Sequence, residues 1–218
     1  MPQIDPATSR TRRPRSSLTV EGILDAAELV AAQGFETLTI RAVATELEAS
    51  PMALYRYFTT KDELVDALLN RVLGRFAVSS ETEDWLADLR NFALDHRRLL
   101  HEHPWAIAPL TQHPNPGPNA LPIGEAALHI LKRAGIIGDD AVATFSGLIA
   151  LNYGWASFVV GKERADELED NQTTAQPLTV PGAYPLTGGV AEAMSRYGSH
   201  KHYDVVLNQL LAGIDANR

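Results

Sequence analysis

The sequence contains no cysteine, and this absence removes several kinds of chemistry at once. Without thiols the chain can form no disulfide, no thiolate metal site and no cysteine nucleophile. The absence also agrees with a reducing compartment, so we expect a cytoplasmic protein. No run approaches ~18 consecutive apolar residues, and no apolar segment follows the charged start. We therefore expect neither a membrane span nor a secretion signal.

The sequence signatures of common enzymes are missing as well. It has no nucleophile-elbow serine, no phosphate-binding loop and no zinc-binding helix motif. His96, His101 and His103 lie close together, but Asp95 stands beside His96 rather than on its helical face. We expect no catalytic residues, no bound metal and no cofactor, and we do not expect an enzyme.

Basic residues are outnumbered, with 19 Lys and Arg against 27 Asp and Glu and a net charge of −8. Taken as an average, this charge argues against a nucleic-acid partner. The charge is segregated, however, because residues 10–15 carry four arginines and no acid, whereas residues 162–171 are rich in acids. A basic N-terminus on an acidic chain indicates an anionic partner at one end. Alternatively, residues 1–17 are only a flexible basic arm in solvent.

Apolar residues recur at helical spacing over most of the chain, which predicts an all-α fold. Thr19, Thr39 and Ser50 stand at N-cap positions, and Pro51 suits a first helical position. Thr60 and Glu63 fit a capping box in which each satisfies the other's backbone donor. Helices are expected at residues 19–33, 39–47, 51–58, 61–76, 84–101, 105–111, 119–134, 140–162 and 190–218. The aperiodic stretch 164–188 is longer than an ordinary loop, so we expect it to be functional, for example as a lid.

The stretch "SPMALYRYFTTKDELV", residues 50–65, follows a short helix and a three-residue turn, which predicts a helix-turn-helix. Such a unit places its second helix in the major groove of DNA, where small side chains at the front allow close approach. Tyr55 and Tyr57 are long enough to reach phosphate oxygens. Lys61 lies at a helix N-terminus that already favours an anion. Alternatively, the tyrosines belong to the core of an ordinary helical bundle.

Residues 18–75 closely resemble the TetR family of bacterial transcriptional regulators. The resemblance rests on "LTIRAVATEL", "LYRYF" and "KDEL", together with the helix that precedes them. It implies a DNA-binding domain over residues 18–65, with Thr39 and Arg41 on its DNA side and Arg41 as a base contact. It further implies contacts to base edges or to the backbone from Pro51, Met52, Ala53, Tyr55, Arg56, Tyr57 and Lys61.

The rest of the chain resembles, more diffusely, the C-terminal domain of tetracycline-repressor-type proteins. The matching segments are "DWLADLRNFALDHRRLLHEHP", the Pro-rich turn that follows, and "YDVVLNQLLAGIDA". The resemblance implies that residues 77–218 bind a small molecule and dimerise through a four-helix bundle, for which the stripe with Leu207 and Leu210 is suited. The side chains expected around the ligand are Phe92, His96, Trp105, His113, Leu128, Asn152, Tyr153 and Trp155.

One departure from the tetracycline-binding members concerns the ligand. Pro109 and Ala77 fall where those proteins carry a metal-coordinating and a drug-contacting histidine. We therefore expect a largely apolar effector rather than a magnesium–drug chelate. The expected partners are a double-stranded DNA operator, a small-molecule effector and a second copy of the chain, with no membrane. The alternative is a helical carrier or enzyme that keeps a vestigial helix-turn-helix, which would lack salt-dependent DNA binding.

Overall fold

The computed structural model describes residues 18–113, 117–169 and 184–217, with residues 162–169 described by their backbone. Within these ranges the regular secondary structure is helical and there is no strand, which confirms the predicted all-α fold class. The helices are α1 Val20–Ala31, η1 Phe35–Thr37, α2 Ile40–Glu46, α3 Pro51–Leu54, α4 Lys61–Leu73, α5 Trp85–Glu102, η2 Pro104–Ala106, α6 Ile107–Gln112, α7 Ala120–Arg133, α8 Gly138–Glu169, α9 Pro185–Gly189, α10 Ala191–Met194 and α11 His200–Ala216.

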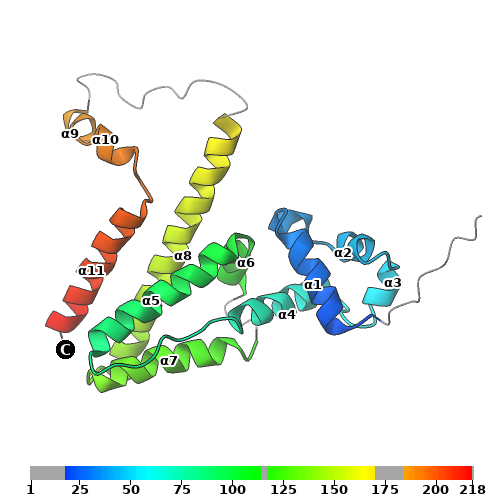
Figure 1. Ribbon diagram of the computed structural model, residues 1–218, viewed down its shortest axis with the longest axis horizontal. Coiled ribbons are helices and arrows are strands. Elements are labelled where there is room, and N and C mark those ends of the chain that lie inside the picture. The colour runs from blue at the N-terminus through cyan, green and yellow to red at the C-terminus, as the bar shows by residue number, and fades with distance from the viewer. Residues whose placement is uncertain (1–17, 114–116, 170–183, 218) are drawn as a thin grey trace, which may run out of the picture.

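Helix α4 joins a small N-terminal group, α1–α3, to the larger group built on α5, α7 and α8 (Figure 1). It contacts α1 on one side and α6 and α7 on the other. Helix α11 packs along α5. One continuous apolar core runs from Ile23 through Leu68 to Leu211. A displacement of α4 would therefore be felt in both halves of the chain.

The helix starts of the N-terminal group follow the predicted capping. Thr19 Oγ1 accepts from Gly22 N at 3.1 Å, Thr39 Oγ1 from Ala42 N at 3.0 Å, and Thr60 Oγ1 from Glu63 N at 3.1 Å. Each bond satisfies a donor that has no partner within the helix. These threonines place α1, α2 and α4 at the positions that the sequence indicates.

Three details of this region were predicted wrongly. Helix α3 ends at Leu54 rather than at residue 58, and Ser50 makes no side-chain cap. The Glu63 carboxylate accepts from Thr59 N and Oγ1, both at 2.7 Å, rather than from Thr60 N. Thr60 must be extended to cap α4, so the chain turns through hydrogen bonds to Leu54 O and still buries Phe58.

The turn of the helix-turn-helix contains a strained residue. Glu48 has φ of 51°, the left-handed region in which a side chain costs roughly 1–2 kcal/mol. Glycine carries no such cost but loses about 0.5–1 kcal/mol of chain entropy on folding. We therefore expect Glu48→Gly to raise the free energy of unfolding by about 0.5–1 kcal/mol in urea denaturation followed by circular dichroism.

Glu46 provides the matched control, because it is exposed and ends α2 only two residues earlier. Glu46→Gly is expected to destabilise by about 0.5–1 kcal/mol, since glycine is a poor helix former. Equal effects of the two substitutions would show that the turn is not strained.

The C-terminal part differs from the predicted single helix over 190–218. The chain forms two helices there, α10 and α11, with Gly198 at φ 79° before the last helix. The break is held by Trp155, whose Nε1 donates to Gly198 O at 3.0 Å. The predicted loop 164–188 is also shorter at both ends, because α8 continues to Glu169 and α9 begins at Pro185. A lid within residues 170–183 lies outside the described residues.

Helix α11 turns its apolar stripe inward. Tyr203, Leu207 and Leu211 are buried within the chain, whereas Val205 and Val206 are exposed. Leu207 therefore belongs to the core of one chain, and its predicted place in a subunit interface is wrong. Leu210 is partly exposed, so it remains accessible to a partner chain.

Helix α8 is apolar over most of its length, and most of its residues are not buried within the chain. Its segment Gly138–Gly161 is long and apolar enough to cross a membrane by length and composition alone, with a mean hydropathy of 1.3 and 11% of that window buried. A search for uninterrupted apolar runs misses it because glycine, serine, threonine and asparagine occur throughout. Its exposed face carries small residues at seven-residue spacing: Ala143, Ala150 and Ser157, and Gly147, Gly154 and Gly161.

Candidate nucleic-acid interface and ligand cavity

The predicted DNA-contacting side chains share the outer face of α2, α3 and the start of α4. Leu54 and Phe58 are buried on the opposite side, as predicted. Met52 is 73% exposed at the front of α3, between the half-buried Pro51 and Ala53. The side chains that surround this front are exposed: Thr39, Arg41, Tyr55, Arg56, Tyr57 and Lys61. The fold thus presents a small apolar tip with polar and basic groups around it.

These side chains differ in how free they are. In the described part of the chain, the Tyr55 hydroxyl and the guanidinium groups of Arg41 and Arg56 have no hydrogen-bond partner. Tyr57 instead donates its hydroxyl proton to Leu18 O at 2.5 Å. Because a phenol has one proton, a phosphate contact from Tyr57 would have to replace this bond. Lys61 Nζ lies 5.1 Å from the centre of the Phe35 ring, which orients the ammonium.

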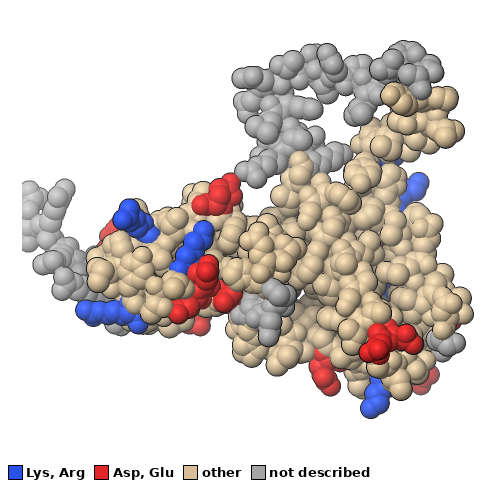
Figure 2. Space-filling model, turned by 180° about the vertical axis from the view of Figure 1, so that it is seen from behind, with Lys and Arg blue, Asp and Glu red and all other residues tan. Residues whose placement is uncertain are grey.

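Ion pairs fasten α4 to α1 behind this surface. Arg71 pairs with Asp25, and Arg75 forms a bidentate pair with Glu28, with Nη2 to Oε2 at 2.7 Å. The hydrogen bond from Arg75 lowers the pKa of the Glu28 carboxyl. Figure 2 shows several basic side chains over this end of the molecule, with acidic side chains next to them. The pairs hold α1 against α4 through charged hydrogen bonds.

A cavity of about 390 Å³ lies between α4, α5, α6, α7 and α8. Such a volume is typical of sites for small organic molecules. Its wall contains His96 from α5, His113 at the end of α6, and Tyr153 from α8. Apolar side chains and one threonine make up the rest: Leu73, Leu110, Thr111, Ala120, Ile123, Phe145 and Ile149.

A buried polar network fixes the state of His96. Asn152 Nδ2 donates to Ala93 O at 2.9 Å and contacts His96 Nδ1 at 3.1 Å, while Asn152 Oδ1 accepts from the Tyr203 hydroxyl at 2.6 Å. Because a carbonyl can only accept, the amide nitrogen must face Ala93 and His96. His96 Nδ1 is therefore an acceptor, and its ring proton is on Nε2. Burial lowers the pKa of His96 to about 4, so the ring is neutral at physiological pH.

The wall of the cavity is bonded directly to α4. His113 Nδ1 lies 2.6 Å from Asp66 Oδ1. Asn119 donates through its backbone N to Asn70 Oδ1 and through Nδ2 to Asn70 O, both at 2.8 Å. These bonds connect the ends of α6 and α7 to the helix that carries the DNA-binding unit. The end of α6 and the start of α7 are thus anchored on α4.

Two family models cover most of the chain. Residues 23–68 match the model of bacterial regulatory proteins of the tetR family, and residues 79–218 match that of the tetracyclin repressor-like C-terminal domain. The chain belongs to the TetR family. It is a transcriptional regulator with a ligand-binding C-terminal domain and, like the regulators it resembles, not an enzyme.

Relatives and solved structures agree with this assignment. An HTH-type transcriptional regulator of Saccharopolyspora erythraea is 30% identical over 94% of this chain and 87% of its own length. The HTH-type transcriptional repressor DrrR1 of Streptomyces coeruleorubidus is 28% identical over 94% of this chain and 80% of its length. Apo ActR of Streptomyces coelicolor shares the fold, with a TM-score of 0.77 and 22% identity over 92% of this chain and 96% of ActR.

The cavity between α4, α5, α6, α7 and α8 is lined by only some of the side chains predicted around the ligand. His96, His113 and Tyr153 line it, and Asn152 stands directly behind His96. Phe92 is buried beside it, 6.4 Å from the Phe145 ring. Trp155 is bonded to Gly198, Trp105 packs on His103 in a separate cleft, and Leu128 is 37% exposed on the outer side of α7.

The apolar wall of the cavity escaped the sequence reasoning. Leu73, Leu110 and Ile123 line the cavity but were not among the predicted ligand contacts. The sequence indicates that these side chains are buried, but it does not indicate which helices face one another across the cavity. The apolar positions that recur at helical spacing on α6 and α7 could have indicated that these helices contribute to the wall. As to metals, the described residues contain no group of three His, Asp or Glu side chains placed to hold an ion.

Proposed function

We propose that this TetR-family chain is a homodimeric repressor that binds an inverted-repeat operator and is released by a small, largely apolar effector. The observation that carries the proposal is the position of α4 between the two sites. Its Leu73 lines the cavity, its Asp66 and Asn70 bond the cavity wall, and its Arg71 and Arg75 hold α1. In the cytoplasm, where the operator would be found, an effector could thereby change DNA affinity without touching DNA.

The operator side follows from the exposed face of α2 and α3. Pro51, Met52 and Ala53 form the tip that enters the major groove, and Arg41 supplies the bidentate donor for a base. The other exposed groups bind the phosphate backbone: Thr39, Tyr55, Tyr57 and Lys61. Arg56 can bind either a base edge or the phosphate backbone. With few base readers, part of the specificity comes from DNA shape.

The exposed face of α8 is suited to pack against the same helix of a second copy of the chain. A Cβ added at Gly147, Gly154 or Gly161 would meet no atom within 4 Å from the other described parts of the chain, so packing among these parts does not require glycine there. Each glycine costs a helix about 1 kcal/mol relative to alanine. Their seven-residue repeat permits the close approach of another helix, which offsets that cost. We place the four-helix bundle on α8 and α11 of each copy, with Val206 and Leu210 at its edge.

The effector is an apolar molecule with at least one oxygen acceptor. His96 offers an Nε2 proton in an otherwise apolar wall, and a neutral imidazole donor pairs well with a carbonyl or hydroxyl oxygen. ActR, which shares this fold, forms complexes with actinorhodin and with (S)-DNPA. Those complexes support a small organic effector in the corresponding domain here. Binding would push α6 and α7 against α4 and change the distance between the two recognition helices, which must match half-sites about 34 Å apart.

A cavity-filling variant tests this assignment. In a thermal-shift screen of apolar small molecules, compounds that raise the melting temperature of the wild type are expected to release DNA. Ile149→Trp fills the cavity and is expected to abolish both effects, because the ligand's volume is occupied. Leu128→Trp, on the outer side of α7, is expected to keep them.

The opposite result, with Leu128→Trp losing the response and Ile149→Trp keeping it, would place the effector elsewhere. Magnesium is not expected to change the response, since Pro109 is buried in α6 and Ala77 lies beyond α4, where neither offers a ligand.

A further inference from the structure

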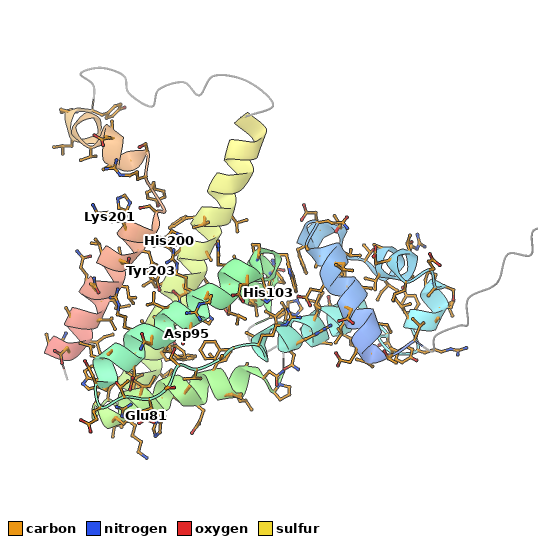
Figure 3. The ribbon with its side chains drawn as sticks, in the orientation of Figure 1. Glu81, Asp95, His103, His200, Lys201 and Tyr203 are labelled. Carbon is orange, nitrogen blue, oxygen red and sulfur yellow. The ribbon has the colours of Figure 1, made fainter. Side chains whose placement is uncertain are left out.

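A second hollow lies on a different face of α5 from the effector cavity. It is a groove of about 420 Å³ between α5, the start of α6, the upper part of α8 and the first turn of α11. Its floor is apolar and includes Leu94, Ile107 and Val160. Figure 3 labels His200 and Tyr203 at this end of α11, on the side that faces α8.

The rim of this groove is basic in a chain of net charge −8. Arg97, Arg98, His101 and His200 line it, and among the described side chains no carboxylate does. Arg98 pairs with Asp95 Oδ1 at 3.0 Å, and the other oxygen of Asp95 accepts from Ser79 N and Oγ. Arg97 is thus the guanidinium at the rim whose charge is not matched by a carboxylate of the described chain.

Arg97 is also held in place. Its guanidinium lies 4.0 Å from the centre of the Tyr203 ring, and Nη2 donates to His200 Nδ1 at 2.8 Å. Tyr203 is itself fixed by its bond to Asn152. Of the five N–H donors of an arginine, one is used here, and the others meet no hydrogen-bond acceptor within the described residues. A positioned planar cation with free donors suits a carboxylate, which it can bind through two parallel bonds.

We propose that this groove binds an organic anion in which a carboxylate is joined to an apolar body. The carboxylate pairs with Arg97 and receives further donors from the imidazoles at the rim, while the apolar body covers the floor. The site is separate from the effector cavity, because the two share no lining residue.

Decanoate and decanol provide matched probes, since they share the apolar chain and differ in the charged head. In isothermal titration with the full-length protein we expect decanoate to bind at least tenfold more tightly than decanol, and its affinity to fall with salt. Arg97→Gln is expected to weaken decanoate binding about tenfold or more, because a charged hydrogen bond is lost. Arg97→Lys keeps the charge but loses the planar fork and the stacking on Tyr203, so its affinity for decanoate is expected to lie between those of the wild type and Arg97→Gln.

Arg90→Gln is the control on the same helix. Arg90 stands seven residues before Arg97 but bonds Asn208 and pairs with Asp204 at 3.6 Å, away from the groove. This variant, and the cavity-filled Ile149→Trp, are expected to bind decanoate like the wild type.

Three results would each overturn the proposal. Equal affinity for decanol would mean that the groove recognises only apolar surface. Loss of decanoate binding in Ile149→Trp would place the probe in the effector cavity. No decanoate binding to the wild type, together with a shift of the monomer–dimer equilibrium in Arg97→Gln, would show that a second copy of the chain fills the groove.

Discussion

Replacing Gly154 with arginine is expected to convert the proposed dimer into monomers that lose at least about 100-fold in affinity for an inverted repeat. The glycine lies in the middle of the exposed small-residue face of α8, where a second helix would approach most closely. A long charged side chain there keeps the helices apart and would be buried without a partner. A monomer holds one half-site at a time and loses the gain from simultaneous binding, about 10²–10⁴-fold. Sedimentation velocity and mobility-shift titrations report the two effects separately.

Gly124→Arg is the matched control for this substitution. Gly124 is also a helical glycine with no atom near its added Cβ, but it lies on α7. It is expected to leave both the dimer and DNA binding unchanged. Leu207, by contrast, would be a poor test, because it is fully buried within the chain and its substitution would damage the core. Intact dimers in Gly154→Arg would refute the interface on α8.

Arg41→Ala is expected to cost about 1–3 kcal/mol of operator affinity, or roughly 5- to 150-fold, and to relax the base preference at one position in each half-site. The guanidinium stands exposed on α2 without a partner in the described chain, so it has no internal role to lose. A bidentate pair with guanine is the contact that an arginine at this position makes best. Affinity measured on operators with each base at that position gives the result.

Lys61→Ala and Tyr55→Phe provide the contrast, since both side chains are assigned to phosphates. They are expected to weaken all sequences about equally, and Lys61→Ala to lower the slope of log affinity against log salt by about one. If Arg41→Ala also weakens every sequence equally, Arg41 is a backbone contact and the readout must come from elsewhere.

Local chemistry is why much of the N-terminal domain could be predicted from sequence. A threonine before an apolar helix start has few alternatives to capping it, and the bonds at Thr19, Thr39 and Thr60 follow this rule. The end of α3 could not be read in the same way. It depends on how Phe58 reaches the core while Thr60 stays extended, which is a tertiary requirement.

The effector cavity was predicted less completely for a related reason. Helical periodicity tells which face of a helix is buried, but it does not tell which helix lies opposite. Trp155 and Phe92 were expected around the ligand, but neither lines the cavity. Trp155 donates a hydrogen bond to Gly198 O before α11, and Phe92 packs beside the cavity against Phe145. His96 and Tyr153 were expected around the ligand because of the resemblance to the tetracycline-repressor-type domain, and both line the cavity.

The central claim is that two copies of this chain read a symmetric operator through α2 and α3. Selection of bound DNA from a random pool tests it most directly, because the enriched sequences report specificity and symmetry together. We predict an inverted repeat whose half-sites lie about one helical turn apart, with its best-defined position lost in Arg41→Ala. Enrichment of a single unrepeated site, or of no sequence at all, would contradict the claim.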